Sequence, residues 1–221
     1  MAASTSSSEL QMRAADALAY LPVSSIMEYR KGETIYDPNR RSNSIYLVVT
    51  GTVGISQLAD GGREVLLDLI RPDELFGELA FLNVPLVAER ATAIEKTGLM
   101  SWNVAEMESL IMKEPRLAVA LLQALARRNG EFTLRIASFA LDSIEQRLAR
   151  SLIRFSERLG TQEETGVVRM MPITHEMLSR YVGTSREIIT QYMSRFRKQG
   201  RVSYSRQEMS LHREALRTVL D

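Results

Sequence analysis

A group of polar side chains between Arg186 and Ser194 can form hydrogen bonds with the edges of nucleotide bases. The group lies on one side of a predicted helix, opposite apolar residues that recur with helical spacing. Arg can donate hydrogen bonds to guanine, Glu can accept one from cytosine, and Gln can pair with adenine. We call this group the polar stripe, and its members are Arg186, Glu187, Thr190, Gln191 and Ser194.

Two short helices and a turn are predicted to position the polar stripe. Thr174 is the expected N-cap of the first helix, and Gly183 supplies a turn in which a positive φ costs little. Thr184 or Ser185 caps the second helix, with Glu187 as a candidate capping-box partner of Thr184. The expected buried faces are Met177, Leu178, Tyr181 and Val182, then Ile188, Ile189, Tyr192, Met193 and Phe196.

Residues 201–211 follow Gly200 and alternate like a short hairpin. Such a hairpin after two short helices is typical of the wing of a winged helix-turn-helix. The second helix would then place the start of the polar stripe where readers of the DNA major groove lie. The alternative is a generic helical hairpin without a DNA-binding role.

Charge is distributed unevenly along a chain whose formal net charge is only +1. Residues 1–141 carry 14 Lys and Arg against 17 Asp and Glu, a net of −3, whereas residues 142–221 carry 14 against 10, a net of +4. A basic C-terminal segment on an acidic body suggests a polyanionic partner. A solvated basic surface would leave the same pattern.

A long helix over residues 116–141 carries apolar residues in a strict seven-residue repeat, spaced 4-3-4-3-4-3. This repeat predicts a partner helix from a second copy of the chain. The alternative is a helix packed on its own domain. Asn129 lies within the repeat, where a buried Asn fixes register and a two-stranded state. We call the repeat the apolar stripe; it begins at Ala118, and its predicted interface residues are Leu122, Leu125, Asn129, Phe132, Ile136 and Phe139.

Upstream of that helix, residues 26–104 alternate between short β-rich runs and turn signals. The spacing predicts a closed β-barrel or jelly roll. The chain therefore divides into four predicted segments. They are a disordered tail (1–8), a sensor domain that opens with a helix over 9–21 (9–115), the dimerisation helix (116–141) and the DNA-binding domain (142–221).

Composition excludes several classes of function. The chain has no Cys and only two His, His175 and His212, so disulfides, thiolate metal sites and a protein-built zinc site are not expected. We find no nucleophile–base pair or phosphate-binding loop and predict no catalytic residue, no metal and no enzyme. No apolar run approaches the roughly 20 residues of a membrane span, and no secretory signal opens the chain. We expect a cytoplasmic protein.

These features together resemble the CRP/FNR regulators, the family of the cyclic AMP receptor protein and the fumarate–nitrate regulator. The resemblance covers about residues 20–215. It is carried by Gly32-Glu-Thr-Ile-Tyr, Tyr46-Leu-Val-Val-Thr-Gly-Thr-Val, Phe76-Gly-Glu-Leu-Ala and Gly183-Thr-Ser-Arg-Glu-Ile. It implies a fold of class α+β: a cyclic-nucleotide-binding-type β-barrel, a long dimerisation helix and a C-terminal winged helix-turn-helix.

The resemblance assigns roles in DNA binding. A Ser-Arg-Glu run opens the family's recognition helix, and it falls on Ser185, Arg186 and Glu187, with Arg186 as guanine reader and Glu187 as cytosine reader. His175 stands where an Arg often contacts phosphate, and Gln191 replaces a second Arg. The predicted DNA-contacting set is Thr174, His175, Ser185, Arg186, Glu187, Thr190, Gln191, Arg197 and Lys198.

The resemblance also implies an effector site in the barrel. In cyclic-nucleotide binders of the family, a Gly-Glu pair and a downstream Arg hold the cyclic phosphate and ribose. The matching set here is Gly77, Glu78, Leu79, Arg90, Ala91 and Thr133. Two features depart from the pattern: the stretch from Glu78 to Arg90 is longer than usual, and only Thr133 matches the Thr-Ser pair that reads the base. A structural Glu78–Arg90 ion pair in an empty barrel is the alternative.

The predicted function is that of a homodimeric transcription regulator. It would bind an inverted repeat of double-stranded DNA, contact RNA polymerase and respond to a cyclic-AMP-like effector, with no membrane partner. One alternative is a regulator of the same fold with another ligand or none, because the absence of Cys excludes a cysteine-ligated iron–sulfur sensor. Another is a non-DNA cyclic-nucleotide module, which the Ser-Arg-Glu run and the basic wing argue against.

Overall fold

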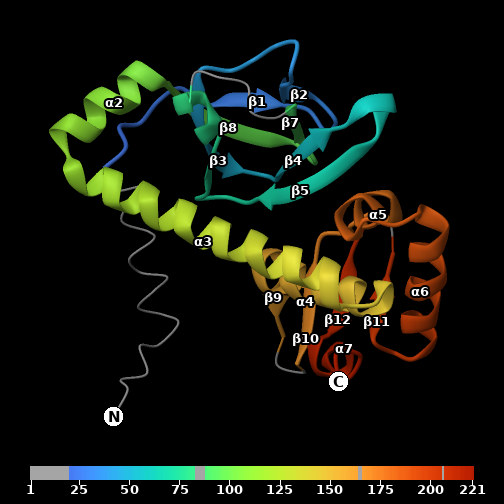
Figure 1. Cartoon of the computed structure of the whole chain (residues 1–221). Coiled ribbons are helices and arrows are strands. Elements are labelled where there is room, and N and C mark those ends of the chain that lie inside the picture. The colour runs from blue at the N-terminus through green and yellow to red at the C-terminus, as the bar shows by residue number, and fades with distance from the viewer. Residues whose placement is uncertain (1–19, 83–87, 164–165, 206) are drawn as a thin grey trace. The chain divides into compact units, whose positions relative to one another are not determined.

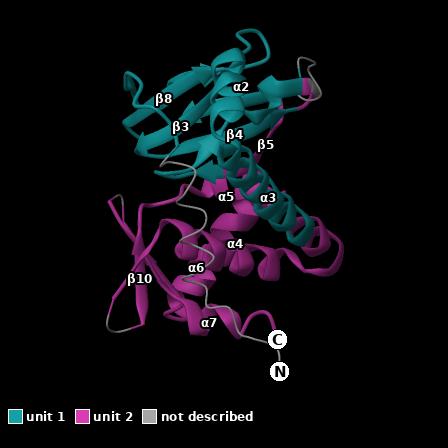
Figure 2. Ribbon diagram, turned by 90° about the vertical axis from the view of Figure 1, so that its left-hand side faces the viewer, with its two compact units in different colours: residues 1–58, 69–134 teal, residues 59–68, 135–221 magenta. Residues whose placement is uncertain are grey.

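A computed structural model describes residues 20–82, 88–163, 166–205 and 207–221 (Figure 1). They form two compact units, one of residues 1–58 and 69–134 and one of residues 59–68 and 135–221 (Figure 2). The predicted tail and nearly all of the helix expected over 9–21 lie outside the described residues. Among the described residues, no helix is long and apolar enough to cross a membrane.

The first unit is built on two antiparallel four-stranded sheets, which confirms the predicted jelly roll. Residues 44–50 and 64–70 are strands within the stretch predicted to consist of β-rich runs and turns. One sheet has the order β1 (Met27–Tyr29), β8 (Thr97–Asn103), β3 (Ser44–Thr50), β6 (Leu75–Phe76). The other has the order β2 (Thr34–Tyr36), β7 (Glu89–Ala93), β4 (Val53–Leu58), β5 (Glu64–Ile70), and residues 64–68 of β5 are counted with the second unit. Short 3-10 helices cover Asp60–Gly62 and Glu78–Leu82.

Two helices follow β8. Helix α2 (Val104–Lys113) begins with a capping box between Asn103 and Glu106, and α3 (Pro115–Leu141) begins at a proline, which suits the first turn of a helix. The start of α3 is fixed to the barrel, because Leu117 and Ala120 join a buried cluster with Ile45, Leu47, Trp102 and Met107.

The second unit contains the winged helix-turn-helix. Helix α4 (Ile144–Leu159) is followed by α5 (His175–Val182), α6 (Arg186–Lys198) and α7 (Arg213–Arg217). The sheet order is β11 (Val202–Tyr204), β12 (Met209–His212), β10 (Val167–Met170), β9 (Thr161–Gln162). Strands β11 and β12 form the predicted hairpin, with Tyr204 opposite Met209. The core of this unit includes Leu148, Leu152, Phe155, Ile189, Met193, Phe196 and Leu211.

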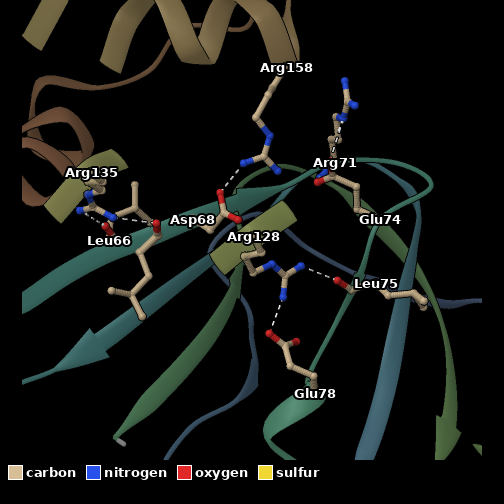
Figure 3. A network of polar contacts seen from close by, with 10 residues as sticks. Leu66, Asp68, Arg71, Glu74, Leu75, Glu78, Arg128, Arg135 and Arg158 are labelled. Carbon is tan, nitrogen blue, oxygen red and sulfur yellow. Dashed lines mark hydrogen bonds and ion pairs between the residues drawn. The ribbon is translucent and has the colours of Figure 1, made fainter. Parts of the chain in front are cut away.

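Within this second unit, two arginines bind residues 66–68 of the segment 59–68. Asp68 pairs with Arg158, and the two side chains are only 4% and 14% exposed (Figure 3). Arg135 donates to the carbonyl oxygens of Leu66, Leu67 and Tyr181 at 2.8, 2.8 and 2.7 Å. Its guanidinium also lies 3.9 Å from the centre of the Tyr181 ring, a cation–π distance.

The ends of two helices have particular features. Gly160 ends α4 but is extended, with φ −98°, so a left-handed cap is not the reason for glycine. A Cβ there would lie 2.2 Å from Val168 Cγ1, so close packing requires glycine. At α6, Ser185 is the N-cap and accepts from the Ile188 amide at 3.3 Å, so the candidate capping box between Thr184 and Glu187 is wrong.

Candidate nucleic-acid interface and effector site

The polar stripe lies on the exposed face of α6. All five of its side chains are exposed, whereas Ile189, Met193 and Phe196 on the other face are fully buried. Gly183 ends α5 with φ +74°, and an added Cβ would lie 2.9 Å from the Phe139 ring, so both backbone and packing require glycine at the turn. The buried face of α6 fixes the helix, and the exposed face presents hydrogen-bonding groups.

The other predicted DNA-contacting residues surround the polar stripe. Thr174 is the N-cap of α5 and accepts from the Met177 amide at 3.1 Å. Arg197 and Lys198 are exposed in the last turn of α6. His175 is half-buried, and its Nδ1 lies 3.0 Å from Thr190 Oγ1 on α6. The structure thus joins the start of α5 to the polar stripe.

The wing contributes one residue that the sequence analysis did not single out. The Tyr204 ring contacts His175 edge to face, with 5.6 Å between ring centres. The Arg197 guanidinium lies 5.3 Å from the centre of the same ring. Only its place in a short alternating hairpin near basic residues could have drawn attention to it. Tyr204 connects the wing to both helices of the helix-turn-helix.

The apolar stripe is largely exposed. Within the first unit, Leu122 is 65% exposed and Leu125 41% exposed, and Asn129 is also exposed. Within the second unit, Ile136 and Phe139 on the same helix are exposed too. Ala118 and Phe132 are half-buried. The chain itself therefore does not bury most of this repeat.

In the barrel, Glu78 pairs with Arg128 of α3 (Figure 3). The described residues contain no Glu78–Arg90 contact. Arg128 also donates to the Leu75 carbonyl at 2.7 Å. The alternative of a Glu78–Arg90 ion pair is therefore wrong. The sequence carries no sign of Arg128 as a partner, because 50 residues separate it from Glu78. Gly77 has φ +87°, and a Cβ there would lie 2.7 Å from the Ser44 carbonyl oxygen, so this position requires glycine.

The remaining predicted effector residues lie in different surroundings. Arg90 is half-buried on β7, and its Nε is buried without a hydrogen-bond partner among the described residues. Ala91 is fully buried, Leu79 is half-buried, and the exposed Thr133 donates to the Asn129 carbonyl of its own helix at 3.0 Å. No described contact joins Thr133 to Glu78 or Arg90.

Aromatic side chains pack beside these residues. Tyr46 stacks with Phe76 and Tyr36, with ring centres 5.0 and 5.9 Å apart, and all three rings are buried. The Tyr36 hydroxyl donates to Glu89 Oε1 at 2.6 Å. Burial raises the pKa of Glu89, and burial together with the Glu89 charge raises the pKa of Tyr36. The sequence analysis had not singled out this cluster, because its members come from four strands.

No cluster of three or more His, Asp or Glu side chains suited to a metal ion occurs in the part of the chain that the structure describes.

The geometry defines a protein with a jelly-roll sensor domain, a long helix with an exposed apolar stripe and a winged helix-turn-helix. Comparisons with known proteins agree. Residues 26–114 match the family model described as a cyclic nucleotide-binding domain, and residues 146–219 match that of a Crp-like helix-turn-helix domain.

The chain is similar to named regulators over most of its length. It is 28% identical over 174 residues to the CRP-like cAMP-activated global transcriptional regulator of Mycobacterium tuberculosis, covering 79% of this chain and 78% of that protein. It is 28% identical over 172 residues to the cyclic AMP receptor protein of Thermus thermophilus, covering 78% and 76%. The structure of FixK2 from Bradyrhizobium japonicum superposes with a TM-score of 0.75 at 21% identity, covering 89% of this chain and 97% of that one.

The chain belongs to the CRP/FNR family of DNA-binding transcription regulators. Members of this family are regulators and not enzymes, in agreement with the sequence prediction.

Proposed function

We propose that this regulator acts as a homodimer that places two copies of α6 in successive major grooves of an inverted repeat. The observation that carries the proposal is the exposed polar stripe on a helix whose other face is fully buried. A two-fold dimer requires half-site centres about one helical turn apart, roughly 10 bp. We also propose that the chain divides into the four segments that the sequence predicts.

Within each half-site, we assign base contacts to the polar stripe. Arg186 donates two hydrogen bonds to a guanine, Glu187 accepts from a cytosine amine, and Gln191 pairs with an adenine. Thr190 contributes a contact of lower specificity. Thr174, His175, Ser185, Arg197 and Lys198 contact the DNA backbone and fix the register of the helix, because phosphate contacts position a protein without specifying sequence.

The occupant of the apolar stripe is a second copy of α3. The argument rests on its seven-residue repeat and its exposure, because apolar side chains in such a repeat pack against an identical stripe. Asn129 pairs with its counterpart across the two-fold axis and selects a two-stranded arrangement. Light scattering tests this directly: a mass near twice the 24.9 kDa of the chain supports the proposal, and a monomer rejects it.

For the sensor domain, we propose an anionic effector of the cyclic nucleotide class. Arg90 supplies the counter-charge, because its Nε is buried and lacks a partner among the described residues. The tight Gly77 turn lets the backbone approach a phosphate closely. Glu78 is held by Arg128 of α3, so a ligand that engages Glu78 also acts on the dimerisation helix.

That same ion pair favours a second candidate, a regulator that needs no effector. Glu78 already has a counter-charge in Arg128, and Tyr36, Tyr46 and Phe76 pack tightly beside it. Calorimetric titration with cyclic AMP, cyclic GMP and cyclic di-GMP, followed by DNA binding with and without each compound, separates the two candidates. If a cyclic nucleotide binds and increases the affinity for DNA, the effector proposal is supported. If the operator is bound with the same affinity with and without all three compounds, the second candidate is supported.

Two further assignments rest on family membership. We propose RNA polymerase as a protein partner, which in vitro transcription from a promoter with the selected operator would test. A regulator of transcription acts where the DNA is, so we place it in the cytoplasm.

A further inference from the structure

His175, Thr190, Tyr204 and Arg197 form a cluster that joins α5, α6 and the wing. His175 Nδ1 lies 3.0 Å from Thr190 Oγ1, and its ring contacts the Tyr204 ring edge to face. Arg197 covers the same Tyr204 ring from the last turn of α6. The position of the His175 ring is therefore set by two other elements and not by its own helix alone.

From the hydrogen bonds of this cluster we assign the proton of the neutral His175 ring to Nδ1. Thr190 has one hydroxyl hydrogen, and it donates that hydrogen to the Arg186 carbonyl at 2.8 Å. The contact with His175 must then be donated by Nδ1–H, because a hydroxyl that donates elsewhere can only accept. The neutral ring consequently carries its proton on Nδ1 and a lone pair on Nε2.

The surroundings of His175 disfavour its charged form in the free protein. Burial, and then the Arg186 charge, lower the pKa of His175 below its usual value. On the wing side, Arg197 adds a second positive group beyond the Tyr204 ring. The nearby carboxylates are engaged elsewhere, since Glu176 pairs with Arg180 and Glu187 accepts from Ser185 and its own amide. A neutral ring has no hydrogen on Nε2 to give to an anion.

We propose that His175 takes up a proton on Nε2 when this regulator binds DNA and that this Nε2–H donates a hydrogen bond to a backbone phosphate, with Tyr204 as the residue that positions the ring. The inference rests on the proposed DNA-binding function. A phosphate beside the ring supplies the negative charge that the free protein lacks there, and a charged donor makes the stronger hydrogen bond. Tyr204 also orients Arg197, so this one ring positions two side chains that contact phosphate.

The proposal predicts how the affinity for DNA depends on pH. The pKa of His175 is low in the free protein, and a phosphate raises it in the complex. Below the lower pKa both states are protonated and affinity is highest; above the higher pKa both are neutral and affinity is lowest. Between the two, affinity falls as pH rises, by up to about tenfold per pH unit for each His175 that contacts DNA.

The chain offers a matched control, because His212 is its only other histidine and is exposed on β12 outside the cluster. The test measures the affinity of wild type, His175→Gln and His212→Gln from about pH 5.5 to about pH 8 at constant salt. The probes are a duplex that the wild type has selected from a randomised pool and a duplex of unrelated sequence. We expect wild type and His212→Gln to lose affinity as pH rises on both duplexes, and His175→Gln to give a nearly flat profile.

An unchanged pH slope in His175→Gln would overturn the inference while leaving the DNA-binding function intact. A wild type that selects no duplex at any pH would instead refute the proposed function.

Two variants of Tyr204 test the positioning role separately from folding. Tyr204→Phe keeps the ring and should keep the pH slope, whereas Tyr204→Leu removes both ring contacts and should flatten it. NMR of the His175 ring nitrogens gives an independent readout: the free protein should carry its neutral proton on Nδ1, and added duplex should raise the pKa of the ring. A proton on Nε2 in the free protein, or an unchanged pKa on DNA, would contradict the proposal.

Discussion

The exposed stripes of α6 and α3 and the interior of the barrel are two different kinds of site. On the stripes, most side chains are exposed, so their residue types indicate directly what a partner must offer. In the barrel, the side chains engage one another: Arg128 pairs with Glu78 (Figure 3), and Glu89 accepts a hydrogen bond from Tyr36. A surface can be interpreted residue by residue, whereas an enclosed site depends on neighbours brought together by the fold.

The largest expected effect is on the apolar stripe. Leu125→Arg places a charge in the apolar interface of each copy, and an unpaired buried charge costs roughly 3–5 kcal/mol. We expect a folded monomer that no longer binds the operator specifically. Light scattering and circular dichroism provide the measurement, with Arg127→Ala, on the opposite side of the heptad, as the control. A dimeric Leu125→Arg variant would refute the two-stranded interpretation of α3.

The next effect is expected inside the barrel. If Arg90 is the counter-charge of an anionic effector, Arg90→Ala should weaken effector binding by about two orders of magnitude or more, because breaking a buried charge pair costs roughly 2–5 kcal/mol. DNA binding without effector should change little, since an effector acts only through its different affinity for two states. Calorimetry and anisotropy measure the two properties.

If Arg90→Ala lowered only the melting temperature, Arg90 would have a structural role. The barrel would then belong to a regulator that needs no effector.

On the polar stripe, the expected effects are smaller but more informative about sequence. Arg186→Ala should cost roughly 1–3 kcal/mol on the preferred operator and relax the choice at one guanine. Lys198→Ala should weaken all duplexes alike and reduce the dependence of affinity on salt. Binding to a set of single-base operator variants distinguishes the two patterns. Equal losses on every variant for Arg186→Ala would move Arg186 from base contact to backbone contact.

The smallest effect concerns Gly130, which lies within α3 but outside the repeat of the apolar stripe. A Cβ at this position meets nothing within 4 Å. Gly130→Ala should therefore stabilise the protein by about 0.5–1 kcal/mol without changing its oligomeric state. Thermal unfolding measures the gain. A destabilised Gly130→Ala protein would mean that a partner approaches this side of α3, so the interface would be wider than the heptad.

Local signals explain why so much of the second unit could be predicted. Thr174, Gly183 and Ser185 each act within a few residues along the chain, and the structure gives Thr174 and Ser185 as N-caps and Gly183 as a left-handed C-cap. The strands over 44–50 and 64–70 were predictable for the same reason, since alternation and turn residues lie within each segment.

Long-range pairings explain what could not be predicted. The Glu78–Arg128 and Asp68–Arg158 pairs join residues 50 and 90 positions apart, and neither segment alone carries a sign of the other. Position 160 is a further example. Glycine is required there by the close approach of Val168 on a neighbouring strand and not by the conformation of the helix end. The contact between Tyr204 and His175 likewise depends on how the wing packs.

The most direct test of the account is selection of duplexes from a randomised pool by the wild-type protein, followed by sequencing. The account predicts an inverted repeat with half-site centres roughly 10 bp apart, and a guanine in each half-site that Arg186→Ala no longer selects. Recovery of a direct repeat or of a single half-site, or of no enriched sequence either with or without the three cyclic nucleotides, would contradict it.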